Sequence, residues 1–239
     1  MRIMGKTALV TGGTDGIGLE VARQLKQRGA IVAVCGRDAG RLASAKDAGF
    51  QAIEADLSTQ AGCDRVVDEL SGVPLDILVN NAGTSGPSDL LGDFDLEQTD
   101  RAIFLNLNAP MHLIAAFLPA MRERPEAAIV NVTSGLAIAP RGAGPVYCAT
   151  KAGLRSFTQT LRYQLRNTRI TVTEALPPVV ETRMTEQNRH KKMSAPDCAA
   201  AIVKAIETGQ EQAYIGATKL LRAVSEVSPA LARRIMIKY

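Results

Sequence analysis

The chain reads Thr11-Gly12-Gly13-Thr14-Asp15-Gly16-Ile17-Gly18 where a short apolar segment, residues 7–11, gives way to a segment of helical period, residues 16–28. Glycines at such a joint permit a tight turn and let the backbone approach a phosphate closely. The first turn of the following helix adds unpaired N–H groups and the positive end of the helix dipole, which attract an anion. An ordinary glycine-rich turn is the alternative, but a position after the first strand of a β-α-β unit favours a dinucleotide-binding loop.

Short apolar segments alternate with segments of helical period along most of the chain. Near-continuous apolarity suits strands that are covered by helices on both faces. Such alternation implies right-handed crossovers, so we predict one α/β domain, residues 1–239, with a Rossmann-type doubly wound parallel sheet of about seven strands and helices on both faces. The predicted strands are 7–11, 31–35, 51–56, 77–80, 127–133, 170–176 and 212–215, and the predicted helices are 16–28, 39–48, 59–71, 96–121 and 146–166.

Composition narrows the classes of protein that fit this sequence. The chain has 239 residues, of which 46% are hydrophobic, and this length suits one α/β domain with a substantial core. Its net charge of +4 comes without a dense Lys/Arg run, so we expect no nucleic-acid partner. The four cysteines have no paired spacing and there are only two histidines, which argues against a metal site or a disulfide framework.

No segment of the sequence has the pattern of a targeting signal or a membrane span. The longest clean apolar stretch, residues 113–120, is shorter than the roughly 20 residues that a spanning helix needs. We therefore expect a cytoplasmic protein with reduced thiols and no membrane span.

The residues after the second predicted strand bear on which dinucleotide is bound. An NAD-binding domain usually places a carboxylate there, about 20 residues beyond the glycine loop, to hold the ribose diol. This chain has Gly36 followed by Arg37, and an arginine pairs well with a 2′-phosphate. A solvated Arg37 is the alternative, Asp38 reads as a helix cap, and the negative charge of Asp15 weakens the inference. We therefore favour NADP(H) as the cofactor and keep NAD(H) as the alternative.

A tyrosine and a lysine lie four residues apart near the start of the predicted helix 146–166. Tyr147 and Lys151 share one face of that helix, and a nearby ammonium group lowers the pKa of a phenol, which is otherwise about 10. Such pairs are common on helix surfaces. This one gains meaning beside Ser134, which follows the predicted strand 127–133 and precedes the tyrosine by thirteen residues.

These motifs, taken with Asn80-Asn81-Ala82-Gly83 and the segment 100–107, resemble those of the short-chain dehydrogenase/reductase family. The resemblance covers residues 5–185, with the motifs in the family's order and at its distances. It implies a dinucleotide-dependent oxidoreductase with one fold for cofactor and chemistry.

The resemblance also implies roles for four catalytic residues. Tyr147 would be the general acid in carbonyl reduction and the base in alcohol oxidation. Lys151 would bind the nicotinamide ribose and lower the pKa of the tyrosine. Ser134 would hydrogen-bond the substrate oxygen, and Asn106 would hold a water in the proton relay.

A larger set of residues is implied to bind the cofactor. Family members usually form dimers or tetramers through the helices that carry Asn106 and Tyr147, so we expect a homodimer or homotetramer. The implied cofactor-binding residues are Gly12, Thr14, Asp15, Gly16, Ile17, Gly18, Arg37, Asp56, Leu57, Asn81, Ala82, Gly83, Tyr147, Lys151, Pro177, Val180 and Thr182.

Two parts of the chain depart from the family's usual pattern. The family commonly has Pro-Gly after its sixth strand, whereas this chain has Pro177-Pro178, and the extra proline removes an N–H group. We expect loop 177–194 and the C-terminal tail 218–239 to define the substrate. The tail lacks the family's closing glycines, and its helix beginning at Ser228-Pro229 could pack on its own domain, a partner subunit or a membrane surface.

The combined pattern predicts an NADP-preferring oxidoreductase that interconverts a ketone or aldehyde with its alcohol by hydride transfer. Its expected partner is a small-molecule carbonyl or alcohol substrate, and we expect no metal. A non-catalytic NAD(P)-binding scaffold or redox sensor of the same fold is the competing hypothesis, and the presence of all four reacting residues argues against it. An epimerase or dehydratase usually has a larger C-terminal substrate region than this chain supplies.

Overall fold

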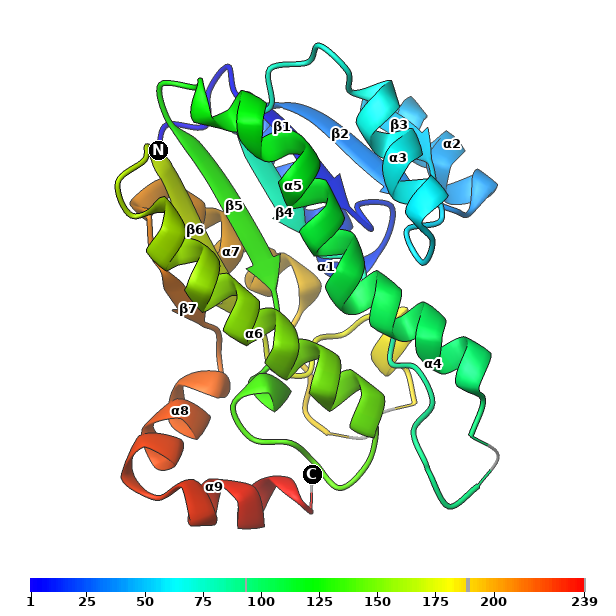
Figure 1. Cartoon of the computed structure of the whole chain (residues 1–239), viewed down its shortest axis with the longest axis vertical. Helices are drawn as coiled ribbons and strands as arrows, with labels where there is room; N and C mark the ends of the chain where they lie inside the picture. The colour runs from blue at the N-terminus through cyan, green and yellow to red at the C-terminus, as the bar shows by residue number, and fades with distance from the viewer. Residues whose placement is uncertain (93, 188–189, 239) are drawn as a thin grey trace.

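Seven parallel strands form one sheet, in the order β3-β2-β1-β4-β5-β6-β7, in the computed structural model of the chain (Figure 1). The structure describes residues 1–92, 94–187 and 190–238. Strand order reverses between β1 and β4, and such a switch point opens a crevice at the carboxyl ends of the strands. The predicted doubly wound sheet is confirmed. The strands are β1 (Thr7–Thr11), β2 (Ile31–Gly36), β3 (Gln51–Glu54), β4 (Ile77–Asn80), β5 (Ala127–Val132), β6 (Ile170–Leu176) and β7 (Gln212–Tyr214).

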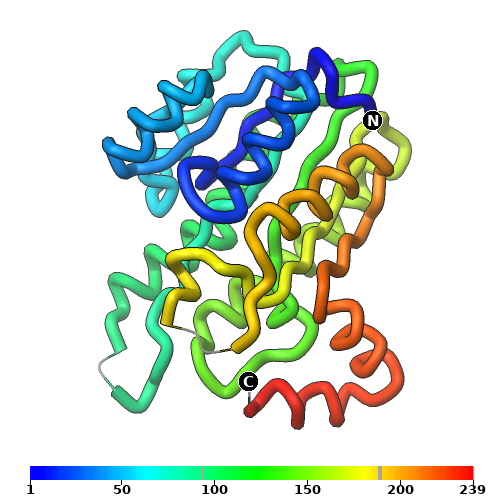
Figure 2. Tube along the Cα trace, turned by 180° about the vertical axis from the view of Figure 1, so that it is seen from behind, coloured from blue at the N-terminus to red at the C-terminus, as the bar shows by residue number. Residues whose placement is uncertain are grey.

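Helices cover both faces of the sheet, as the apolarity of the strands predicts (Figures 1 and 2). Leu25 of α1 and Ile202 of α7 belong to the core on one face. Val66 of α3, Leu113 of α5 and Leu161 of α6 belong to the core on the other. The helices are α1 (Gly16–Gln27), α2 (Ala39–Asp47), α3 (Gln60–Glu69), α4 (Leu96–Ile103), α5 (Ala109–Arg122), α6 (Pro145–Leu165), α7 (Ala195–Thr208), α8 (Thr218–Val227) and α9 (Pro229–Met236), with the short helical segments η1 (Phe104–Asn108), η2 (Gly135–Ala137) and η3 (Arg183–Thr185).

Acidic side chains cap the first two helices. The Asp15 carboxylate accepts a hydrogen bond from the Gly16 N–H at 2.8 Å, and Asp38 accepts one from the Arg41 N–H at 2.9 Å. These bonds satisfy N–H groups that have no partner within the helix. Asp38 is therefore a helix cap, as predicted. Gly29 follows α1 with a φ of 86°, a backbone conformation that favours glycine.

The predicted helix 96–121 is a helical stretch in three parts, because the π-helical segment η1 lies between α4 and α5. Such π-helical turns are frequent at functional sites. Among the described helices, the stretch Leu96–Arg122 is the one long and apolar enough to cross a membrane by length and composition, with a mean hydropathy of 1.4. Its side chains Leu113, Phe117 and Met121 are buried in the core, and 39% of its most apolar window is buried.

The long loop 177–194 is described except for residues 188 and 189. A parallel bridge between Val180 and Met193 closes it, and η3 lies inside it. Ser194 then caps α7 by accepting a hydrogen bond from the Asp197 N–H at 3.1 Å, and the sequence Ser194-Ala195-Pro196 is typical of a helix start. The loop is thereby held at both ends, above the carboxyl edge of the sheet.

The C-terminal tail 218–239, described as far as residue 238, forms α8 and α9 at one end of the molecule (Figure 1). The helix predicted at Ser228-Pro229 is α9, whereas α8 has no counterpart in the sequence-based expectation. Ala139, Ala232 and Met236 form a small separate core between the tail and the loop after β5. The tail therefore packs on its own domain beside the segment that follows Ser134.

Two glycines in equivalent first helical turns give a test of close packing. A Cβ at Gly62 of α3 would lie 2.0 Å from the backbone oxygen of Asp56, whereas a Cβ at Gly40 of α2 would meet the Asp38 carboxylate only at 3.5 Å. We expect Gly62→Ala to lower the free energy of unfolding by about 3 kcal/mol. We expect Gly40→Ala to raise it by about 0.5–1 kcal/mol, because alanine costs less backbone entropy in a helix. Urea denaturation measures both, and equal effects would contradict the packing described.

Candidate active site

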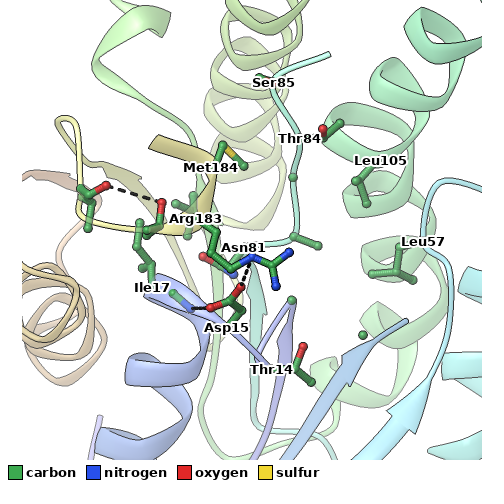
Figure 3. Close-up of a pocket in the computed structure, with 18 of the residues that line it drawn as sticks. Thr14, Asp15, Ile17, Leu57, Asn81, Thr84, Ser85, Leu105, Arg183 and Met184 are labelled. Atoms are coloured by element: carbon green, nitrogen blue, oxygen red, sulfur yellow. Dashed lines mark hydrogen bonds and ion pairs between the residues drawn. The ribbon is translucent and has the colours of Figure 1, made fainter. Parts of the chain in front are cut away.

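A cavity of about 650 Å³ lies at the carboxyl ends of the central strands, where the strand order reverses (Figure 3). This volume falls within the range of small-molecule and cofactor sites. Its lining comes from the glycine loop, the ends of four strands, the start of α6 and loop 177–194. The sequence-predicted residues in the lining are Gly12, Thr14, Asp15, Gly16, Ile17, Arg37, Asp56, Leu57, Asn81, Ala82, Gly83, Ser134, Tyr147, Lys151, Pro177, Val180 and Thr182.

The glycine loop approaches its neighbours too closely for side chains. Gly12 has a φ of 63°, and a Cβ there would lie 3.0 Å from the Ala82 Cα atom. Gly16 has a φ of 53°, and a Cβ there would lie 3.0 Å from the Thr182 side chain of the long loop. The backbone between β1 and α1 is therefore exposed to the cavity as a cradle, which fits the pyrophosphate of a dinucleotide.

Gly18 is a predicted cofactor residue that lies buried behind the loop, outside the cavity lining. A Cβ at Gly18 would lie 2.4 Å from both the Gly12 carbonyl oxygen and the Asn81 side-chain nitrogen. This glycine therefore allows α1 to pack closely on the loop, and it acts on the cavity through that packing.

The ribose-binding end of the cavity is closed to a carboxylate at position 36. A Cβ at Gly36 would lie 2.6 Å from the Thr14 hydroxyl, so a longer side chain there would displace the glycine loop. Arg37 and Arg41 line this end instead. The buried Nε atom of Arg41 has no hydrogen-bond partner among the described residues, while its Nη2 atom lies 3.3 Å from Asp38. Two guanidinium groups thus border this end of the cavity.

Asp56 lies at this edge of the cavity, and its carboxylate already accepts hydrogen bonds from other side chains. Burial acts to raise its pKa, but hydrogen bonds from Ser58 and the guanidinium of Arg101 together hold the pKa below its usual value. The Arg101 Nη2 atom donates to Asp56 at 2.6 Å, and the Ser58 hydroxyl donates to it at 2.8 Å. The aspartate therefore ties α4 to the edge of the cavity and stays ionised at neutral pH.

Tyr147 and Ser134 meet where α6 begins and β5 ends. Burial raises the pKa of the Tyr147 phenol, while a hydrogen bond with Ser134 and the charge of Arg141 act in the opposite direction. The Ser134 hydroxyl also accepts a hydrogen bond from the Leu136 N–H at 3.1 Å, which orients it at the start of η2. The two hydroxyl groups are therefore held together at the cavity wall.

Lys151 lies one helical turn beyond the tyrosine and is 4% exposed. Its ammonium donates to the Val132 carbonyl at 2.8 Å and lies 5.6 Å from the centre of the Tyr147 ring. Burial lowers the pKa of Lys151 to about 8, because the charged form loses hydration. The group remains mostly protonated at neutral pH, so a cation faces the cavity beside the phenol.

Asn106 is fully buried beside the cavity, and its amide is engaged on both sides. Its oxygen accepts from the Thr84 N–H at 2.9 Å, and its nitrogen donates to the Thr84 carbonyl at 2.8 Å and the Thr150 hydroxyl at 3.1 Å. In this arrangement the side chain joins the loop after β4 to α6. The asparagine thereby holds two cavity walls together through the helix that carries Tyr147.

Several residues of the cavity lining were not predicted from the sequence. Arg183 of η3 reaches across the cavity to Asp15, with 3.6 Å between Nε and the carboxylate (Figure 3). No local sequence pattern predicts this pair, because the two residues are far apart in the sequence. Arg41 had a detectable signal, because it lies four residues after Arg37. Its contact with the cavity nevertheless depends on how α2 packs.

A family model described as short chain dehydrogenase matches residues 6–193 of this chain. The uncharacterized oxidoreductase DltE of Bacillus subtilis is 43% identical over 197 residues, which cover 80% of this chain and 78% of the relative. The ketoacyl reductase HetN of Nostoc sp. is 31% identical, over 98% of this chain and 88% of the relative.

Among solved structures, a short chain dehydrogenase from Burkholderia cenocepacia in complex with NADP superposes with a TM-score of 0.89. Its sequence is 25% identical, and the match covers 99% of both chains. The sheet topology, the glycine loop and the match to the family model agree over most of the length. The chain is therefore an NAD(P)-dependent oxidoreductase that belongs to the short-chain dehydrogenase/reductase family.

Proposed function

We propose that the protein is an NADP(H)-preferring oxidoreductase that interconverts a ketone or aldehyde with its alcohol, with Tyr147 as acid and base. The observation that carries this proposal is that Ser134, Tyr147 and Lys151 line the same cavity as the glycine loop. The nicotinamide coenzyme, when bound, exchanges a hydride with the substrate carbon. The chain's own residues orient the reactants, exclude water and move the proton.

The proton-transfer roles follow from the environment of each group. In reduction, the Tyr147 hydroxyl gives its proton to the carbonyl oxygen as that oxygen becomes a hydroxyl. The Ser134 hydroxyl, which lines the cavity with the tyrosine, orients the same oxygen. Burial makes the phenolate unfavourable. The Lys151 ammonium, 5.6 Å from the centre of the Tyr147 ring, is the cation proposed to stabilise it.

Replacing the phenol hydroxyl tests the acid–base assignment. We expect Tyr147→Phe to lower kcat for NADPH-dependent carbonyl reduction by about 100- to 10,000-fold, because the proton donor is lost. Tyr163→Phe is the matched control, since Tyr163 lies on the same helix and its side chain is 67% exposed. Turnover is measured as NADPH oxidation against a panel of ketones and aldehydes. Equal rates for wild type and Tyr147→Phe would contradict the mechanism.

The preference for NADP(H) is supported by the charge at the ribose end of the cavity. Arg37 and Arg41 line it, and the close approach of Gly36 to Thr14 leaves no room for a carboxylate that would hold a ribose diol. The neighbouring Asp38 carboxylate is engaged as a helix cap and as a partner of Arg41. A 2′-phosphate would therefore meet guanidinium groups, and the carboxylate at the start of α2, Asp38, is already engaged.

Substitution of Arg37 tests this preference. We expect Arg37→Ala to weaken NADPH binding by about 10- to 100-fold, because a charge-assisted contact with the 2′-phosphate is lost. NADH binding should change little. Fluorescence titration with each coenzyme measures the two Kd values, and Arg23→Ala, an exposed pair partner of Glu20 on α1, serves as control. An unchanged ratio of the two affinities would overturn the role given to Arg37.

The lowered pKa of Lys151 predicts how stability depends on pH. The folded protein holds this proton with a pKa of about 8, below the ordinary 10.5, so the unfolded chain binds more protons between these values. Stability should therefore rise with pH in this window. Relative to Lys151→Met, the wild type should gain about 2–3 kcal/mol in free energy of unfolding between pH 7 and pH 10. Urea denaturation of both proteins across this range measures the difference, and a flat difference would show that the lysine is not destabilised by burial.

The proposal also covers the oligomeric state, the cellular compartment and the segments that select the substrate. The solvent faces of α5 and α6 carry small residues, among them Ala116, Ala152 and Ser156, and such faces allow helices of two subunits to approach closely. We expect a homodimer or homotetramer through these helices. All four cysteines are free, which is consistent with a reducing cytoplasm. Loop 177–194 and the C-terminal tail are proposed to select a small carbonyl substrate.

A further inference from the structure

A fully buried carboxylate, the one charged side chain of strand β6, lies below the cavity. Glu174 belongs to β6, next to β5, and has 0% of its surface exposed. Burying an ionised carboxylate costs free energy unless the group is paired and hydrogen-bonded. The partners of Glu174 therefore indicate its role. Those partners come from the two elements that carry the proposed acid–base residues.

Arg155 of α6 is the charged partner. Its Nη1 atom donates to both carboxylate oxygens of Glu174, at 3.1 and 3.0 Å. Its Nη2 atom donates to the Tyr214 hydroxyl at 3.3 Å, which holds the guanidinium from the β7 side as well. Arg155 lies one helical turn beyond Lys151 and two beyond Tyr147, so this ion pair anchors the catalytic part of α6 to the sheet.

Thr133 is the second partner, and it belongs to the other half of the site. Its hydroxyl lies 2.9 Å from Glu174 Oε1 and 3.2 Å from the Ala175 carbonyl. Thr133 is flanked by Val132, whose carbonyl accepts from Lys151, and by Ser134. The carboxylate therefore contacts the segment that holds both the serine and the acceptor of the lysine.

The pair contributes little to stability in itself. A buried ion pair commonly contributes no more than well-packed apolar residues of the same volume, because desolvation offsets the attraction. The directionality of their hydrogen bonds is a better explanation for charged groups at this place. Hydrogen bonds to a carboxylate fix distances and angles that apolar contacts do not fix. What these bonds fix is the end of β5 relative to α6.

We propose that Glu174 and Arg155 are a positioning pair that sets the Ser134 hydroxyl and the Lys151 ammonium at their working distance from the Tyr147 phenol. The proposal rests on the proposed carbonyl-reductase function of the same site. Neither residue lines the cavity, so both act through the elements that they join.

The chain offers a matched control on the same helix. Arg162 of α6 also bonds to β6, donating from Nε to the Val172 carbonyl at 3.1 Å, and its Nε atom lies 3.7 Å from Glu211. It makes no bond to Thr133 and lies near the end of α6 away from Tyr147. If α6 needs only to be fastened to the sheet, then loss of Arg162 and loss of the Glu174 charge should affect turnover alike.

The test compares Glu174→Gln, Thr133→Val, Thr133→Ser and Arg162→Gln. We expect Glu174→Gln to lower kcat about tenfold per folded molecule, with the Kd for NADPH changed less than twofold, because only the reacting geometry is loosened. Thr133→Val should lower kcat in the same way, and Thr133→Ser, which keeps the hydroxyl, should restore it. Arg162→Gln should leave kcat unchanged. Hydrogen–deuterium exchange should increase within residues 132–151 in the first two variants only.

Each outcome decides the proposal. Wild-type kcat and exchange in folded Glu174→Gln would overturn it, as would an equal loss of kcat in Arg162→Gln. If Glu174→Gln does not fold, the contrast between Thr133→Val and Thr133→Ser decides, and equal kcat in these two would overturn it. If the wild type reduces no carbonyl compound, the proposed function fails, and the exchange data still show whether the pair orders residues 132–151.

Discussion

The hydroxyl of Thr11 holds together the two strands between which the sheet changes direction. It accepts hydrogen bonds from the Asn81 and Ala82 N–H groups at 2.9 and 3.0 Å, and the Asn81 side chain donates to the Thr11 carbonyl at 2.9 Å. These bonds bring the end of β4 against the end of β1. Because the loop after β1 must turn within this narrow space, only glycine fits at positions 12 and 18. These bonds hold the two strand ends side by side, and the connections that follow β1 and β4 cross to opposite sides of the sheet. The cavity lies between these two connections.

Charged groups in the interior lie around the reacting residues, and their costs differ. Lys151 is buried near a phenol and a single carbonyl, so its ammonium is held at the expense of a pKa lowered to about 8. Glu174 is buried with an arginine nitrogen that donates to both of its oxygens and with a hydroxyl, so its charge is well compensated. The first arrangement keeps a cation available to the cavity. The second directs backbone segments. Both accept an electrostatic cost that an apolar core of the same size would avoid.

Much of the fold could be predicted because local patterns and tertiary packing agree. Strands 77–80 and 127–132 are apolar apart from one asparagine each, Asn80 and Asn131, and they are buried on both faces. The caps at Asp38 and Ser194 follow from side chains that bond to the next helical turn, which is a local interaction. The π-helical segment at Asn106 and the helix α8 were missed. The first lies where the Asn106 side chain bonds to the Thr84 backbone, and the second packs on a loop more than 70 residues away in the sequence.

The sequence by itself determined the family, the order of the strands and helices, and the residue types that meet a dinucleotide, because these depend on spacing along the chain. Only the tertiary structure decided which of those residues face the cavity and which support it. Gly18 and Asn106 proved to act from behind the lining, and Arg41 and Arg183 proved to reach it. In the sequence Glu174 is a single charged residue in strand β6, and only the fold brings Arg155 and Thr133 to its carboxylate. The physical reason is that parallel strands bring distant segments to one edge, so contacts among their ends have no trace in local sequence.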